Sequence, residues 1–194
     1  MRKVAVIFPG VGYTKDRPLL YYAAKIASTY KYELRFVDFS GIEWSKEKLK
    51  DRDFLLKTLE KYLLITETTL EDTQDLSGDD VVFISKSIGT VVATAYEKKK
   101  TLSVKQICFS PLEMIGNYVR EEGAVLFCGD SDPYADYKLL DRIAKEKKLE
   151  IQRVSGGNHS LETGDVRVDL DNMKSIMQRV AEVITDMNPY RVTV

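Results

Sequence analysis

The residues around Ser87 are of types that would suit a serine nucleophile. Ser87 lies in the stretch VVFISKSIGT (residues 81–90), which begins with four β-branched or aromatic residues and has a small residue two positions before that serine and two after it. The pattern predicts a strand buried on both faces, a tight turn and then a helix. A serine hydroxyl is a poor nucleophile until a neighbouring base takes its proton. Another part of the chain must therefore supply that base.

The chain contains one histidine, His159, in the stretch VSGGNHSLE (residues 154–162). Gly156 and Gly157 predict a turn here, after a predicted strand. A lone histidine is more often a packing or surface residue than a base, so its place in the fold decides its interpretation. An acidic stretch, CGDSDPYAD (residues 128–136), follows another predicted strand and offers three carboxylates.

Hydrophobic patterning predicts the elements that must position these residues. Runs of apolar, β-branched and aromatic residues predict six strands, at residues 3–8, 33–39, 81–84, 106–110, 124–128 and 149–154. Apolar residues at helical spacing predict helices at residues 17–30, 45–70 (one long helix or two), 91–100, 137–148 and 168–187. Strands that alternate with helices predict a parallel sheet with helices on both faces, a three-layer α/β/α sandwich.

The stretch SKSIG resembles the G-x-S-x-G nucleophile elbow of the α/β-hydrolase superfamily, with Ser85 in place of the first glycine. The resemblance extends over nearly the whole chain, and small lidless members of the dienelactone-hydrolase and carboxylesterase types look most similar. It implies a minimal α/β-hydrolase fold without a cap domain, one domain over residues 1–194, and a six-stranded parallel sheet in the order 2-1-3-4-5-6.

The same resemblance implies a catalytic triad of Ser87, Asp132 and His159. In the superfamily the base follows the last strand, where His159 stands, and the acid lies in a G-x-x-D loop, which Asp132 completes here. Asp130 and Asp136 are the alternatives for the acid. Asp130 stands close to the end of its strand, and Asp136 suits the cap of the following helix.

The resemblance also implies two backbone donors for an oxyanion hole, the N–H groups of Val11 and Ile88. Glycines on both sides of Val11 would let the backbone approach a substrate closely. The residues expected to bind the substrate are Gly10, Gly12, Tyr13, Leu112 and Tyr134.

These residues lead us to expect a serine hydrolase that cleaves a small ester or thioester through an acyl-enzyme intermediate. Only residues 111–123 separate the fourth and fifth predicted strands, which is too short for a helical lid, so we expect an open site. Two alternatives stay open. One is a non-catalytic binding module with the same fold, and the other is a flavodoxin-like phosphate or nucleotide binder that uses the turn PGVGYT (residues 9–14).

The composition argues against nucleic acid, a membrane and a metal ion as binding partners. The formal net charge of −1 gives no global field for nucleic acid, and no apolar run approaches the length of a membrane span. One histidine and two cysteines, Cys108 and Cys128, cannot make a zinc set, so neither a metal nor another cofactor is expected. The cysteines are predicted as buried free thiols. With no signal-peptide pattern at residue 1, this favours a cytoplasmic protein.

Overall fold

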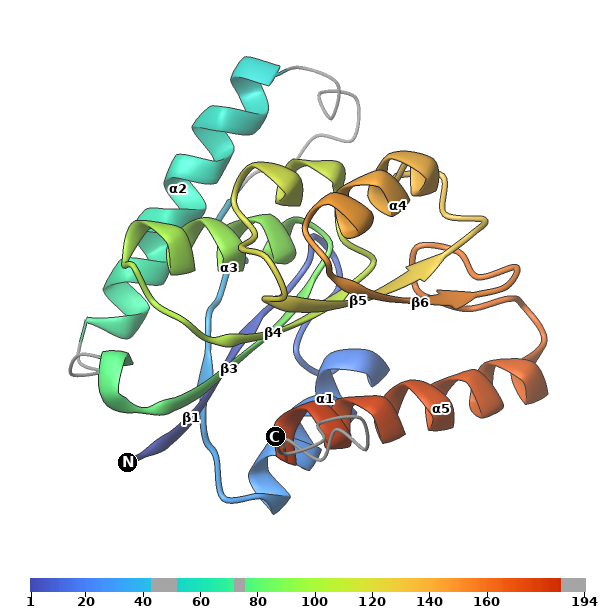
Figure 1. Ribbon diagram of the computed structural model, residues 1–194, viewed down its shortest axis with the longest axis horizontal. Coiled ribbons are helices and arrows are strands. Elements are labelled where there is room, and N and C mark those ends of the chain that lie inside the picture. Colours follow the sequence, from blue (N-terminus) through green and yellow to red (C-terminus); the bar gives the residue numbers. More distant parts are fainter. Residues whose placement is uncertain (43–51, 72–75, 186–194) are drawn as a thin grey trace.

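The computed structural model describes residues 1–42, 52–71 and 76–185 (Figure 1). Its strands are β1 (Lys3–Phe8), β2 (Glu33–Phe36), β3 (Asp80–Lys86), β4 (Lys105–Phe109), β5 (Ala124–Gly129) and β6 (Glu150–Val154). Its α-helices are α1 (Pro18–Thr29), α2 (Arg52–Leu70), α3 (Ile88–Lys99), α4 (Tyr137–Glu146) and α5 (Val166–Thr185). Two 3-10 helices, η2 (Leu76–Gly78) and η3 (Glu113–Asn117), lie between them. Each predicted element is present with ends shifted by a few residues; predicted helical residues 45–51 and 186–187 lie outside the described residues.

The six strands form one parallel sheet in the order β2-β1-β3-β4-β5-β6, which confirms the predicted order. Helices α2, α3 and α4 cover one face of the sheet, and α1 and α5 cover the other (Figure 1). The winding reverses between β1 and β3, because the chain leaves these neighbouring strands toward opposite faces. A ligand site is expected at the carboxyl ends of strands at such a reversal.

The central strands are buried on both faces, which explains their continuous hydrophobic sequence. In β1, Val6 packs into the apolar cluster under α2 and α3, and its neighbour Ile7 packs into the cluster under α1 and α5. Phe83 and Ile84 alternate between the same two clusters in β3. This double packing fixes the strand ends, so the loops that follow them start from a rigid base.

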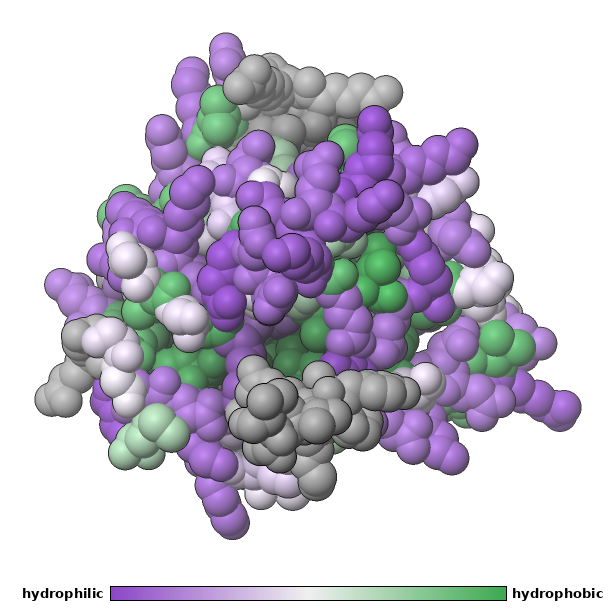
Figure 2. All heavy atoms as spheres, in the orientation of Figure 1, coloured by the Kyte–Doolittle hydropathy of each residue, from purple (hydrophilic) through white to green (hydrophobic). Residues whose placement is uncertain are grey.

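The visible surface is mostly hydrophilic. Figure 2 shows charged and polar side chains over most of this side of the molecule, with hydrophobic side chains visible mainly in the furrows between them. None of the helices in the described parts of the chain combines the length and the apolar character that a membrane crossing requires.

Candidate active site

Ser87 occupies a strained turn between β3 and α3. Its φ of 56° and ψ of −126° fall in a region that residues with a side chain rarely adopt. The Ser87 N–H donates to the carbonyl oxygen of Phe109 in β4 (3.0 Å), and the Thr90 hydroxyl donates to the Ser87 carbonyl oxygen (2.7 Å). These bonds hold the serine in place above the carboxyl end of the sheet.

The small residues on either side of the turn have different structural roles. A Cβ added at Gly89 would lie 2.5 Å from the carbonyl oxygen of Pro9, so α3 can approach the end of β1 only because this residue is glycine. Ser85 has room for a Cβ, and its buried hydroxyl donates to the carbonyl oxygen of Ile107 in β4 (3.1 Å). The serine at the first small position is therefore compatible with the turn.

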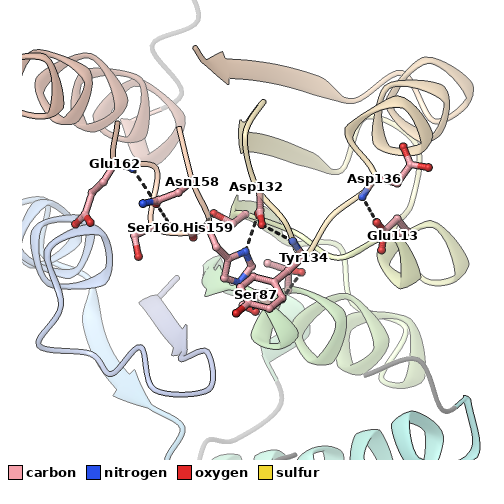
Figure 3. Close-up of polar contacts among 11 residues, drawn as sticks. Ser87, Glu113, Asp132, Tyr134, Asp136, Asn158, His159, Ser160 and Glu162 are labelled. Atoms are coloured by element: carbon pink, nitrogen blue, oxygen red, sulfur yellow. Dashed lines mark hydrogen bonds and ion pairs between the residues drawn. The ribbon is translucent and has the colours of Figure 1, made fainter. Parts of the chain in front are cut away.

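Three side chains from distant parts of the sequence meet at Ser87. His159 Nε2 lies 2.8 Å from Ser87 Oγ, and His159 Nδ1 lies 2.7 Å from Asp132 Oδ2 (Figure 3). The other Asp132 oxygen accepts the N–H of Tyr134 (2.9 Å). The Asp132 side chain is only 3% exposed, so little water competes for its bond to the imidazole.

The two alternative acids lie in the same loop but have other partners. Asp130 Oδ1 accepts the N–H of Gly156, at 2.7 Å, and thereby ties the β5 loop to the β6 loop. Asp136 is the N-cap of α4 and accepts the N–H groups of Lys138 and Leu139. Neither side chain contacts the imidazole in the described structure, so Asp132 is the carboxylate that orients it.

The loop that carries His159 is held by contacts that sequence reasoning missed. The Ser110 hydroxyl donates to the carbonyl oxygen of His159 (2.9 Å), and Asn158 Oδ1 accepts the N–H of Ser160 (2.7 Å). The ring of Tyr134 meets the imidazole edge to face, with centroids 5.1 Å apart (Figure 3). The residue type of Ser110, which follows β4, does not predict its contact with the His159 carbonyl oxygen.

A two-residue turn, Val11 and Gly12, lies beside the nucleophile. Gly10 and Tyr13 close it with two backbone hydrogen bonds of 3.1 and 3.3 Å, and Gly12 has a φ of +66°, which favours glycine. A Cβ added at Gly10 would lie 3.1 Å from the Cβ of Ser87. The turn therefore packs directly against the serine.

Two backbone N–H groups near Ser87 have no acceptor among the residues that the structure describes. Within the described residues, the N–H of Val11 and the N–H of Ile88 donate to no group of the chain. Ile88 is the first residue of α3, where N–H groups lack an intrahelical partner and the helix dipole favours negative charge. Both donors could thus receive an oxyanion formed at the serine.

The residues expected to bind a substrate differ in exposure. Tyr134 is 43% exposed and stands next to His159. Tyr13 is half-buried, and its hydroxyl accepts the N–H of Leu19 at the start of α1. Leu112 is 9% exposed and packs into the core cluster under α3, so its surface contributes little to the site.

A cavity of about 540 Å³ lies on the other side of the Val11–Gly12 turn, within the range of small-molecule sites. Its apolar lining comes from the end of β2, the segment after it, and α2: Phe36, Val37, Phe39, Ile42 and Tyr62. Its charged lining residues are Lys15, Asp16 and Asp38. A hydrogen bond from Ser40 lowers the pKa of Asp38, so this carboxylate stays ionised at neutral pH.

The residue before Ser87 is a buried lysine. Lys86 is 1% exposed, and its Nζ lies 5.0 Å from the centroid of the Tyr13 ring. Burial lowers the pKa of Lys86 to about 7, an effect that the negative charge of Asp132 partly opposes. A side chain at this position of the turn usually points aside, so the sequence alone assigned Lys86 no role.

No protein-family model and no curated protein matches the sequence. Solved structures do match it. A protein assigned to the α/β-hydrolase superfamily from Xanthomonas campestris is 14% identical, with a TM-score of 0.65 over 95% of this chain and 99% of its own. The α/β-hydrolase fold is thereby established for this chain. The esterase Pf2001 of Pyrococcus furiosus is 14% identical, with a TM-score of 0.65 over 95% of this chain and 83% of its own. Est1E of Butyrivibrio proteoclasticus is 13% identical, with a TM-score of 0.64 over 95% of this chain and 89% of its own.

Within this α/β-hydrolase fold, Ser87 is the candidate nucleophile among the described residues, because its hydroxyl lies beside the His159 imidazole. Both cysteines are free and buried, as predicted, and burial raises the pKa of Cys108 and of Cys128 to about 12, so neither thiol forms a thiolate readily. No group of three or more His, Cys, Asp or Glu side chains among the described residues could hold a metal ion.

Proposed function

We propose that this protein is a serine hydrolase that cleaves a small ester or thioester through an acyl-enzyme intermediate. The single observation that carries the proposal is the hydrogen-bonded series Ser87, His159 and Asp132. A serine hydroxyl bonded to an imidazole, whose other nitrogen is bonded to a buried carboxylate, is the arrangement that activates serine for attack.

In the proposed reaction, Ser87 Oγ attacks the substrate carbonyl carbon while His159 Nε2 takes the hydroxyl proton. The Asp132 carboxylate holds the imidazole in the required tautomer and stabilises the imidazolium. The N–H groups of Val11 and Ile88 receive the oxyanion. The imidazolium then gives its proton to the leaving oxygen or sulfur. Water, deprotonated by the same imidazole, hydrolyses the acyl-enzyme and regenerates the serine.

The surroundings of the site support a substrate of modest size. Only a short segment with η3 separates β4 from β5, so no cap domain is inserted between these two strands. The leaving group must stay next to His159, which follows β6, so the acyl group extends toward β1 and β2. The cavity beside the Val11–Gly12 turn lies on that side, and it has a larger apolar than polar lining, although Lys15, Asp16 and Asp38 also line it. We therefore propose an uncharged aliphatic or aromatic acyl group.

Turnover of p-nitrophenyl acetate and butyrate tests the proposal. We expect Ser87→Ala and His159→Ala each to lower kcat about 10³-fold or more, because each removes a member of a unit that acts jointly. Ser155→Ala is the matched control, because Ser155 is an exposed serine of the histidine loop. It should keep wild-type turnover.

Circular dichroism and melting temperature show whether each variant is folded. A folded Ser87→Ala protein that retains wild-type turnover would refute the proposed nucleophile. A folded wild-type protein without turnover of any ester in a chain-length series would favour a binding module that has this fold but no hydrolase activity.

A further inference from the structure

Lys86 is an amine that the proposed reaction leaves without a role. It is 1% exposed at the end of β3, immediately before the nucleophile. Burying a charged amine is costly unless a partner compensates it. Among the described residues, the contact to its Nζ is the face of the Tyr13 ring, and no carboxylate forms an ion pair with it. A leucine or methionine would fill the same space at a lower cost, so the amine itself needs an explanation.

The Lys86 side chain lies against the turn beside the nucleophile. A Cβ added at Gly10 would lie 3.4 Å from Lys86 Cγ, so the stem of the lysine packs on the start of this turn. The Lys86 Nζ faces Tyr13, which closes the other end of the turn. The Tyr13 hydroxyl is fixed in turn by the N–H of Leu19. The side chain thus contacts both residues that hold Val11 in place.

We propose that Lys86 is a positioning residue, which supports the Gly10–Tyr13 turn and places a positive charge close to the oxyanion that forms at Ser87. The inference rests on the proposed function. A positive charge next to the turn stabilises the transition state in which the substrate oxygen becomes negative. The Asp132 carboxylate in turn favours the charged form of Lys86.

The charge of Lys86 changes within the range of ordinary assays, because burial lowers the pKa of Lys86 to about 7. On the side of the acid loop, the ionisable groups around Lys86 are Asp132 and its hydrogen-bond partner His159. On the side of the turn, the ionisable group is Tyr13, which also interacts electrostatically with Arg17 and Glu162. Burial raises the pKa of Tyr13 to about 12, so the phenol stays neutral below that pH. Because its own pKa is about 7, Lys86 is about half protonated at pH 7 and has lost nearly all of its charge by pH 9.

The test compares Lys86→Met, which keeps the length and loses the charge, with Lys86→Arg, which keeps a charge at all assay pH values. We expect Lys86→Met to lower kcat about tenfold at pH 7 with little change in KM, less than the 10²–10³ lost with a direct oxyanion donor. Its melting temperature should equal or exceed that of the wild type, because a buried amine is removed. Lys86→Arg should retain more of the wild-type kcat than Lys86→Met.

The pH dependence of kcat distinguishes an effect of the Lys86 charge from an effect of its packing. We expect the wild-type kcat to fall as the pH rises from 7 to 9, and both variants to lack this fall. The matched control is Lys25→Met, because Lys25 is an exposed lysine whose Nζ lies 5.5 Å from the ring centroid of Tyr21, away from the site. It should keep the wild-type kcat and the wild-type profile.

A wild-type kcat and a wild-type pH profile in Lys86→Met would overturn the inference. Lys86→Gln is a second uncharged variant in case the methionine variant does not fold. The wild-type profile alone is informative as well, since a kcat that does not fall between pH 7 and 9 contradicts the proposed charge. Ser87→Ala in the same assay distinguishes a failure of this inference from a failure of the proposed function. If it is inactive while Lys86→Met is unaffected, only the role of Lys86 is refuted.

Discussion

Asp130 and Asp132 stand two positions apart in one loop, and their side chains bind different parts of the molecule. Asp132 reaches His159 Nδ1, whereas Asp130 accepts the N–H of Gly156 in the loop that carries the histidine. The first contact orients the base, and the second fastens the loop that holds it. At the residue scale, one carboxylate therefore has a proposed chemical role and the other a structural one.

Amide variants at these two positions separate the roles. Asp132→Asn should lower kcat about 10³–10⁴-fold, because an amide no longer favours the tautomer in which Nε2 accepts the serine proton. Asp130→Asn should leave kcat within about threefold, because an amide oxygen still accepts the Gly156 N–H. Initial rates with p-nitrophenyl acetate measure both. The larger loss in Asp130→Asn would reverse the assignment of the acid.

Helix α3 joins the nucleophile at its start to a buried polar contact near its end. Glu97 is 3% exposed and accepts hydrogen bonds from the Val104 N–H (3.0 Å), the Gln106 side-chain amide (2.8 Å) and Arg120 Nε (2.9 Å). These bonds fasten the helix to β4 and to the segment before it. At the element scale, the helix that orients Ser87 is anchored at both ends.

Removing this anchor should destabilise the fold. We expect Glu97→Ala to lower the free energy of unfolding by about 3 kcal/mol, because it leaves a buried N–H and a buried amide without an acceptor. The control is Glu121→Ala, whose ion pair with Lys148 is exposed and contributes at most about 0.5 kcal/mol. Urea unfolding measures both values. A loss below about 1 kcal/mol in Glu97→Ala would contradict this role.

The elements were predictable from sequence because each depends on local patterning. Runs of hydrophobic residues predict the strands, and the alternation of strands with helices predicts a parallel sheet covered by helices on both faces. Details that depend on contacts between distant residues were not predictable. The lysine type of Lys86 gives no sign that its side chain is buried, and nothing in the type of Leu112 distinguishes the core from a rim. Likewise, the partner of Ser85 lies in another strand.

The placement of the site follows from the parallel sheet as a whole. Loops after β1, β3, β5 and β6 all leave the same edge, so side chains as far apart in sequence as Ser87 and His159, 72 positions, meet there. This is why the sequence predicts that Ser87, Asp132 and His159 lie at one edge of the sheet. At the scale of the molecule, the proposed activity depends on the convergence of these four loops, because one misplaced loop would separate His159 from Ser87.

Labelling with a fluorophosphonate probe tests this convergence, because the probe reacts with a serine that a neighbouring base activates. We expect one phosphonate per wild-type chain, mapped by mass spectrometry to Ser87, and slow or no labelling of folded His159→Ala. The exposed-serine control, Ser155→Ala, should be labelled as the wild type is. A folded wild-type protein that stays unlabelled, or that is labelled at another serine, would contradict the account.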